Sequence, residues 1–515
     1  MKWHWKILIG ICFAILLLVV INLGLNLWIK FQLPKIINRE NESVYSISYK
    51  NVSVSLWKGN ITANGIIIVP KAALNDSINK ARIYAKVKTI KVREFKIWEL
   101  VFNDKIKAKS ITVDYPQVNL YQKKYKDKMI NSVVASFEKV VSVKDIFIKH
   151  GNFKIINSEN YKPVLTVSNI NLNIGGILIT NTVLDDKIPF KFRNYALRCE
   201  NLYYHPNEFY KLKIKKITTT KSDLKIYKFE MLPAYSRKEF VTIIPKEKDL
   251  YAVLCDSITI NKINWGFNAD DFFFHCNTVS VNNAAANIYR SKEPPDDLTK
   301  KFLCNKLLRD LKFSLKVDTL KVRNSILEYE EEKSIKLGSG KLTLNAFNLT
   351  AISIDSGFKK VKLPDLVIKI KCSFMNTSPL NIFWKLNVLD KTDGFNIKGT
   401  LTNFDVKNIT PFSKPHLSLT AKGIIEEVNF NFTGNDNKNQ GELAVKYDDL
   451  KFTIYKKDDP KKKNKLLTFV ARIFVKKDTK DEIKNTYIDI ERTPDKSFYN
   501  LLWRSIAEGL KKILV

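Results

Sequence analysis

The chain has 515 residues, of which 45% are hydrophobic and 11% aromatic, and its 86 Lys plus Arg against 52 Asp plus Glu give a formal net charge of +34. This apolar content excludes a disordered chain and suffices for two or three ordinary domains or one elongated one. The lysines are scattered singly among apolar residues, which favours solvated strand faces over a nucleic-acid interface and leaves an anionic membrane surface as the alternative.

The N-terminus predicts a membrane anchor. A tail, residues 1–6, precedes an apolar run at residues 7–29 that is long enough to cross the roughly 30 Å hydrocarbon core as a helix. Trp3 and Trp28 lie near its ends, where amphipathic rings favour the membrane interface. The run is too long for a cleaved signal peptide, and no small-residue cleavage site follows it. Lysines on both sides leave the orientation open, and an export-type N-terminus favours the outside.

Residues 30–125 read as a series of short strands. After the connection FQLPKII come SISYKNVSVSLWKG, NITANGIIIVP, ARIYAKVKTIKVREF and KIKAKSITVDYPQVNLYQ. Each alternates apolar and polar residues with period two, as a half-buried strand does. No long helical stretch interrupts this part or the next, so the sequence predicts a mainly β, mainly antiparallel fold.

A degenerate unit recurs in and around residues 126–356. Each unit has two apolar residues separated by one polar residue, then four intervening residues, then two more apolar residues separated by one. In a continuous strand the second pair would point to the opposite face from the first, so a turn or bulge must lie between the pairs. His150-Gly151 and Arg323-Asn324-Ser325 supply turn chemistry at that point. The spacing alone is common in so apolar a chain, so the ordinary hairpins of a large all-β protein are the alternative. The copies lie at Ile111, Val113, Val118 and Leu120; at Ile146, Ile148, Phe153 and Ile155; at Ile258, Ile260, Trp265 and Phe267; at Leu320, Val322, Leu327 and Tyr329; and, more weakly, at Ile217, Thr219, Leu224 and Ile226.

Amphipathic helices are predicted at three places. Apolar residues recur at helical spacing over 129–141 and over 298–311, each before a copy of the repeated unit, and Pro294-Pro295-Asp296 is a good start for the second. Residues 357–480 return to strands. In the tail, residues 481–515, the segment SFYNLLWRSIAEGLKKILV predicts a helix that caps the β-structure or lies on a membrane.

No pattern points to catalysis. The five histidines, at positions 4, 150, 205, 275 and 416, lack metal-pair spacing, and the nucleophile-elbow, phosphate-loop and zinc-protease motifs are absent from the sequence. Adjacent acids such as Asp270-Asp271, Asp296-Asp297 and Asp448-Asp449 fall at turns or helix starts, where aspartate is expected. The six cysteines have no CxxC spacing; we interpret them as isolated buried thiols, with a Cys255–Cys276 pair left open. We therefore predict a non-enzymatic protein with no cofactor and no metal.

Two stretches resemble the AsmA-like family of bacterial envelope proteins, the inner-membrane-anchored AsmA, TamB and YhdP type. Near the N-terminus, the resemblance rests on Tyr45, Ile47, Tyr49 and Val52, on Gly65, Ile67, Val69 and Pro70, and on the segment Ile111–Tyr121. Near the C-terminus it rests on Gly441, Tyr447, Asp448, Leu450 and Ile454. It covers most of the chain, least clearly residues 180–310. It implies a transmembrane helix followed by an elongated, curled antiparallel β-sheet, groove-like or taco-like, with a few short amphipathic helices.

The resemblance implies a protein of the bacterial inner membrane, single-pass through residues 7–29, with the bulk of the chain in the periplasm. Such a protein would handle or conduct phospholipid between inner and outer membrane and support outer-membrane assembly, with envelope proteins as further partners and no nucleic acid. The apolar pairs of the four full copies are then the candidate lipid-facing residues, because apolar strand faces can bury acyl chains at about 0.8 kcal/mol per methylene. A scaffold filled by its own side chains, without lipid conduction, is the alternative; an envelope hydrolase would need a cleft with convergent polar groups.

Overall fold

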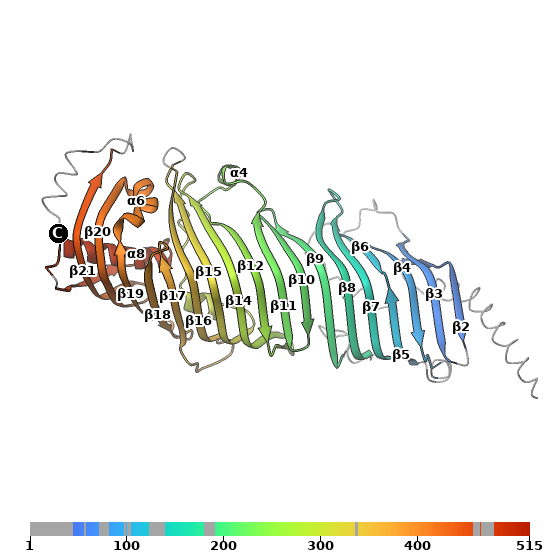
Figure 1. The fold of residues 1–515 in the computed structure, drawn as a ribbon. Helices are drawn as coiled ribbons and strands as arrows, with labels where there is room; N and C mark the ends of the chain where they lie inside the picture. Colours follow the sequence, from blue (N-terminus) through green and yellow to red (C-terminus); the bar gives the residue numbers. More distant parts are fainter. Residues whose placement is uncertain are drawn as a thin grey trace, which may run out of the picture. The chain divides into compact units, whose positions relative to one another are not determined.

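The computed structural model describes residues 45–55, 58–71, 82–96, 99, 103, 105–122, 140–179, 191–334, 338–456, 464, 478–480 and 482–514. The chain divides into two compact units, the first comprising Met1–Pro206 and Leu212–Lys221 and the second Asn207–Lys211 and Ser222–Val515. Both are mainly β with few helices, as predicted, and each is built on a curled sheet (Figure 1). The predicted anchor, residues 7–29, lies outside the described residues; among those described, no helix is both long and apolar enough to cross a bilayer.

The first unit contains strands β1 to β10. Two pairs of short strands each act as one interrupted strand, so the pairing order is β1/β2, β3, β4, β5/β6, β7, β8, β9, β10. The bounds are Tyr45–Ser48, Asn51–Ser55, Asn60–Pro70, Arg82–Arg93, Lys105–Asp114, Gln117–Gln122, Val140–Asn157, Pro163–Ile179, Asn194–Asn207 and Tyr210–Thr220.

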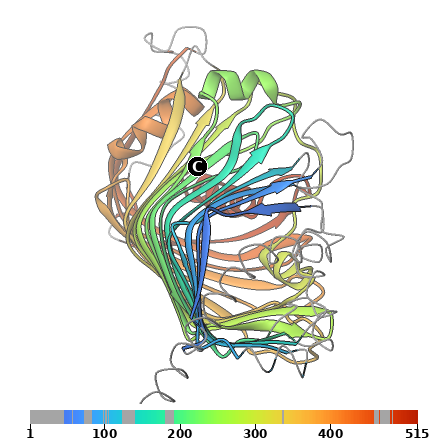
Figure 2. The same ribbon diagram turned by 90° about the vertical axis from the view of Figure 1, so that its right-hand side faces the viewer.

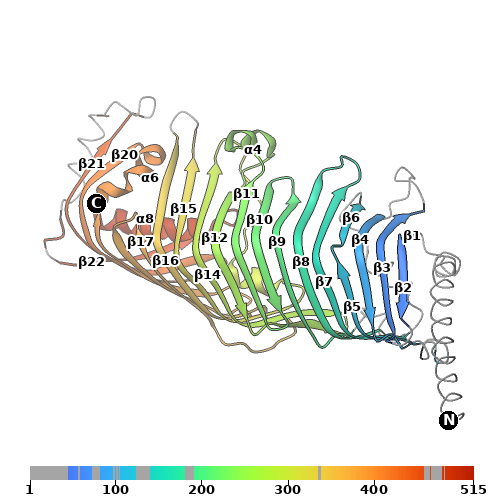
Figure 3. The same cartoon turned by 45° about the vertical axis from the view of Figure 1, so that its right-hand side comes forward.

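The second unit contains strands β11 to β22. Its pairing order is β11, β12/β13, β14, β15 and then each strand with the next to β22 (Figure 3). The bounds are Asp223–Pro233, Leu250–Asn261, Asn264–Asn268, Asp271–Ser291, Ser314–Glu332, Ser339–Asp355, Leu366–Phe374, Ser378–Leu386, Phe395–Asp405, Leu419–Gly434, Lys438–Ile454 and Lys484–Glu491.

The sheet of each unit is mixed: most neighbouring strands are antiparallel, as predicted, but each sheet also contains parallel neighbours, which the sequence did not predict. In the first unit β7 runs parallel to β5 and β6, and in the second β15 runs parallel to β14. Parallel neighbours need a crossover that returns the chain to the starting edge, whereas antiparallel neighbours need only a hairpin. The crossover between β14 and β15, residues 292–313, contains the second segment predicted as a helix; residues 123–139, between β6 and β7, lie outside the described residues.

The long strands bend sharply, as Figure 2 shows, because left-handed residues are aligned across neighbouring strands. In the second unit Lys228, Asn283 and Asn324 have φ of 51°, 52° and 46°. A polar ladder joins this corner: Lys228 Nζ lies 2.6 Å from Asp256 Oδ1, Asn283 donates to Asp256 at 3.0 Å, and Asn324 donates to Asn283 at 3.0 Å. In the first unit the matching line contains Gly65, Tyr115, His150, Asn169 and Asn201.

A second line of corners runs parallel to the first, about six residues along each strand. In the second unit Lys262 and Ser353 have φ of 52° and 65°, and Asn277 donates to Asp318 at 3.2 Å between them. In the first unit Gly59, Glu94 and Gly176 are left-handed, with Lys109 paired to Glu94 at 2.5 Å. Each left-handed residue reverses which face of the sheet the following side chains occupy. The predicted turn is therefore confirmed at Tyr115, His150, Lys262 and Asn324, each four positions after the first apolar residue of its copy.

The helices agree only in part with prediction. Helix α8, Phe498–Leu514, confirms the C-terminal helix. Helix α5 spans only Cys304–Arg309, so the helix predicted over 298–311 is wrong for the residues on either side of α5. Asp297 Oδ1 instead accepts a hydrogen bond from the Thr299 backbone N–H before the helix. The prediction over 129–141 lies outside the described residues except at its end, where Val140 and Val141 belong to β7.

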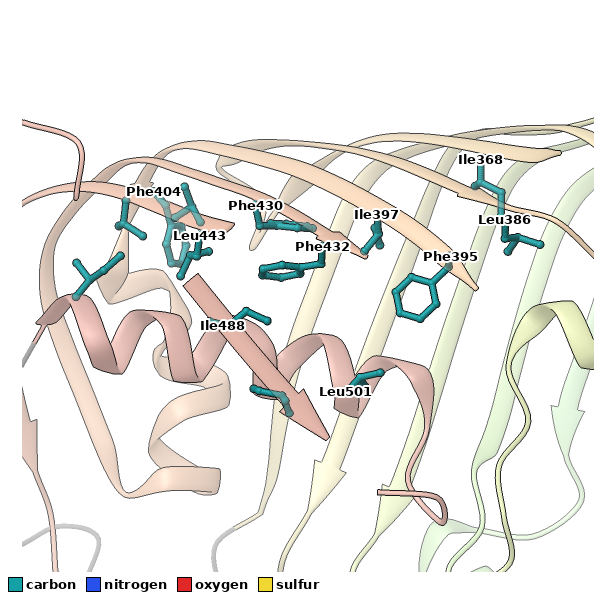
Figure 4. Close-up of a cluster of buried hydrophobic side chains, with 14 of the residues drawn as sticks. Ile368, Leu386, Phe395, Ile397, Phe404, Phe430, Phe432, Leu443, Ile488 and Leu501 are labelled. Carbon is teal, nitrogen blue, oxygen red and sulfur yellow. The ribbon is translucent and has the colours of Figure 1, made fainter. Parts of the chain in front are cut away.

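The main core lies in the second unit, where β17 to β22 curl around α8 (Figure 4). Phe432, Leu443 and Ile488 are fully buried there against Leu501 of the helix. A smaller cluster packs helix α4, Arg237–Ile243, onto β12 and β14 through Phe240, Leu250 and Tyr289. Helix α6, Thr410–Leu417, and the short helix η2, Val406–Ile409, follow β19 and pack on β16 and β20.

Helix α4 is tied to β15 by a nearly buried carboxylate. Arg237 donates two hydrogen bonds to Glu330, at 2.9 and 2.8 Å, and the Glu330 side chain is only 11% exposed. Arg237, together with the Asn287 amide and the Ser339 hydroxyl, lowers the pKa of Glu330 to about 2.

We expect Asn324→Val to lower the free energy of unfolding by about 1–2 kcal/mol, because a β-branched residue resists the left-handed conformation. Asn324→Gly tolerates that conformation and should lose only the hydrogen bond to Asn283. Urea denaturation followed by circular dichroism checks the order. A valine variant as stable as the glycine variant would show that the corner does not depend on this residue's backbone.

Glu330→Gln should lower the free energy of unfolding at pH 7 by about 2 kcal/mol, and with it the melting temperature, because the charge-assisted pair with Arg237 is lost. Because the folded pKa lies below the ordinary value of 4.5, the stabilisation is complete above pH 4.5 and declines as pH falls towards 2. Melting curves of wild type and variant should therefore converge over that range. Glu482→Gln, at an exposed pair with Lys484, is the matched control and should show little effect at either pH.

Candidate functional site

The inner face of the curled sheet in the second unit carries two unbroken rows of mostly apolar residues. Each member pairs directly with the next across neighbouring strands, between the two lines of corners. The first row is Leu224, Ile260, Val279, Leu320, Ala351, Ile368, Trp384, Ile397, Phe432, Gly441 and Ile488; the second is Ile226, Ile258, Val281, Val322, Leu349, Ile370, Ile382, Gly399, Phe430, Leu443 and Thr486.

The rows pass from a covered core to a half-buried surface. At the C-terminal end they lie under α8, where Ile397 is 2% exposed and Phe432 is fully buried. Leu320 still packs against this core, but Val322, Val281 and the residues beyond them on β12 do not belong to it and are only half-buried. The same register positions therefore form the protein's core at one end and an apolar surface at the other.

Four similar rows cross the first unit, which has no buried hydrophobic cluster among its described residues. Two lie between the lines of corners and two lie beyond them. They are Val54, Ile61, Val92, Ile111, Ile146, Ile174 and Tyr195; Val52, Ala63, Ile90, Val113, Ile148, Leu172 and Leu197; Ile47, Ile68, Ala85, Val118, Phe153 and Val167; and Ile83, Leu120, Ile155, Leu165 and Tyr204.

The opposite face is polar at the alternate positions. In the second unit Lys321 pairs with Thr350, which pairs with Lys369, and Lys369 and Lys398 are exposed. In the first unit Lys91 pairs with Thr112 at the equivalent place. Each sheet thus has one apolar and one lysine-bearing face, as period-two alternation dictates.

The structure brings most of the predicted residues together. Ile111 pairs with Ile146, Val113 with Ile148, Val118 with Phe153 and Leu120 with Ile155, all in the first unit, and Leu120 is 1% exposed. In the second unit Ile258, Ile260, Leu320 and Val322 join the two rows, and Leu327 and Tyr329 lie beyond the corner on β15.

Trp265 and Phe267 are different. They lie on β13 and pair with Phe274 and Phe272, and they are 36% and 38% exposed. They contribute to neither row. Sequence reasoning also missed the row members on β1 to β4, β8, β9, β14 and β16 to β22, which only the strand register could have identified.

Helix α8 ends the apolar surface on one side. Its buried face contains the small residues Ser505 and Gly509, which let the helix approach β21 and β22 closely; Ser505 accepts a hydrogen bond from Asn439 at 2.8 Å, and both residues are buried. A β-carbon at Gly509 would lie 2.4 Å from Leu443 Cδ2. The helix therefore caps the sheet, the first of the two predicted roles.

Among the residues that the structure describes, no cluster of thiols or metal-binding side chains gathers at one place. Cys199, Cys255, Cys276 and Cys372 are buried free thiols, as predicted, and Cys304 is partly buried; burial raises the pKa of Cys372 to about 11. Among the described residues no group of His, Cys, Asp or Glu side chains is arranged to hold a metal. A cavity of about 570 Å³ lies between β15, β16 and η2, and its one acid, Glu328, is paired with Lys341 at 2.5 Å.

No protein-family model matches this chain. No curated protein matches it.

Gly509→Leu should destabilise the second unit by about 2 kcal/mol, because the added side chain meets Leu443 in a packed interface. Ala507→Leu, on the exposed face of the same helix, is the control and should change stability little. Thermal melts report both. Equal melting temperatures for the two variants would contradict close packing of α8 on the sheet.

Proposed function

We propose that this chain is a membrane-anchored envelope protein of the AsmA-like type that holds or conducts phospholipid on the inner face of its curled sheet. In this proposal residues 7–29 anchor it in the bacterial inner membrane, the rest lies in the periplasm, and the curled sheet acts as a taco-like groove between inner and outer membrane. The protein needs no enzyme activity or cofactor for this role.

The observation that carries the proposal is the continuity of the two rows in the second unit. Positions that form a dry core beneath α8 continue, residue by residue, to Val281 and Val322, which no described helix covers. Half-buried apolar surface that continues a core still leaves apolar area in contact with water, which is costly and supports a binding role for this surface. The rows run across the strands, so an extended acyl chain lying along a row would contact one apolar side chain per strand.

The shape of the rows also suits an acyl chain. The two rows lie between the polar ladders through Asn283 and Asn324 and through Asn277 and Asp318, and apolar residues such as Leu327 continue beyond the first ladder. A row that crosses several strands at one side chain per strand fits a linear hydrocarbon better than a globular apolar ligand, and each buried methylene stabilises binding by about 0.8 kcal/mol.

Photo-crosslinking at single sites tests this assignment. We expect benzoylphenylalanine at Val322 or Ile148 to crosslink to phospholipid in cells, and the same group at the neighbouring outward positions Arg323 or Lys149 to give little lipid adduct. The group at Ile397, which lies under α8, should also give none. Equal lipid adducts at Val322 and Arg323 would overturn the proposal.

The second candidate function is a structural scaffold for outer-membrane protein assembly. It differs from the first in whether the purified chain contains bound phospholipid. Gentle detergent extraction followed by mass spectrometry should find bound phospholipid if the face conducts lipid. A chain reproducibly free of lipid, whose crosslinks at Val322 reach only protein, would favour the scaffold.

A further inference from the structure

The hairpin formed by β13 and the start of β14 has one free edge. Strand β13 pairs with β14 from Asn264–His275 to Asn268–Asp271. Strand β11, the neighbour of β12 on this side, begins at Asp223, which pairs with Asn261. Strand β13 starts after Asn261 and therefore extends past the end of β11. Among the residues that the structure describes, none pairs with the outer side of β13, and its burial is low throughout, with only Gly266 half-buried.

The free edge presents hydrogen-bonding groups at its two aromatic residues. The two-residue turn Ala269-Asp270 makes Asn268–Asp271 the hydrogen-bonded closing pair. Hydrogen-bonded and non-hydrogen-bonded pairs alternate along an antiparallel ladder, so Trp265 and Phe267 point their N–H and C=O groups away from β14. These four groups lie beside two exposed aromatic side chains.

Nothing in β13 guards this edge. Natural edge strands carry lysine, proline or a bulge that discourages pairing with another chain. The other edge strand of the second unit, β22, has Lys484, Asp489 and Glu491. Strand β13 reads Asn-Trp-Gly-Phe-Asn, with no charge and no proline.

The order of these residues is symmetric about Gly266, with an aromatic residue on either side and an asparagine beyond each. We propose that β13 pairs antiparallel with β13 of a second copy, around a twofold axis through Gly266. In that register Trp265 faces Phe267 of the second copy and Asn264 faces Asn268, each twice, and the four outward backbone groups of each strand find partners.

A second copy suits the edge better than a lipid surface. A membrane interface accepts aromatic rings but offers no ladder for unpaired backbone groups. Aromatic pairs directly across a ladder add stability to the sheet, and the cluster would extend through Phe272 and Phe274, the partners of Phe267 and Trp265. This pairing is independent of the lipid proposal and survives its failure.

The first test is the molar mass of the purified full chain, by light scattering with the detergent contribution subtracted. We expect twice the chain mass of 59.5 kDa. Phe267→Pro removes one outward N–H without touching the ladder to β14 and should give the monomer. Phe267→Lys should also give the monomer, whereas Tyr487→Lys, an exposed aromatic on the guarded edge strand, should leave the dimer intact. A monomeric wild-type chain, or a dimer unaffected by both Phe267 variants, would overturn the proposal.

The second test fixes the register. Across the free edge Gly266 meets its own copy at a non-hydrogen-bonded pair, where α-carbons are about 4.5 Å apart, close enough for a disulfide. Gly266→Cys should therefore crosslink two chains under mild oxidation. Asn264→Cys should not, because the two copies of position 264 would be separated by four residues, roughly 13 Å. Crosslinking of Asn264→Cys as fast as Gly266→Cys would contradict pairing about Gly266.

Discussion

The architecture of both units depends on one backbone constraint, the alignment of left-handed residues in two lines across neighbouring strands. A single residue such as Asn324 at φ 46° turns its strand and reverses which face the following side chains occupy. When the strands on either side turn at the same register, the hydrogen-bond ladder survives and the whole sheet bends. The cost of a left-handed residue, about 1–2 kcal/mol each, is offset by side-chain ladders such as Asn324 to Asn283 to Asp256.

The bends decide where apolar surface can lie. Between the two corners each strand has room for only two inward side chains, and the register stacks these into the two rows. The covering of the rows then differs along the second unit: α8, with Ser505 and Gly509 at its contact face, approaches closely enough to bury Phe432 and Ile488 completely. Farther along, at Val322 and Val281, the same geometry leaves an apolar strip, and this strip is the basis of the proposed lipid site.

Much of the local structure could be read from the sequence, because it is written in neighbouring residues. Period-two alternation identified the strands, and the parity flip around His150 and Asn324 identified the corners, since only an unusual backbone conformation keeps both apolar pairs on one face. Helix α8, which contains Leu501, Ser505 and Gly509, was predicted from the helical spacing of its apolar residues. The helix predicted over 298–311 was mostly wrong because its apolar residues serve a crossover: Leu303 enters the main core, while Asn305 donates to the backbone carbonyls of Asn387 and Gly394.

The pairing of distant strands could not be read in this way. Alignment of Val279 with Leu320, or of Ile111 with Ile146, depends on parallel neighbours joined by crossovers, and no local signal specifies that offset. For the same reason Trp265 looked like part of an inner face, although its strand lies at an exposed edge. The central claim, that the uncovered part of the two rows holds lipid, is tested most directly by a density map of the full chain extracted with its native lipids. We expect elongated density along Val281 and Val322 that ends where α8 covers the rows; a strip filled by the protein's own side chains would contradict lipid binding.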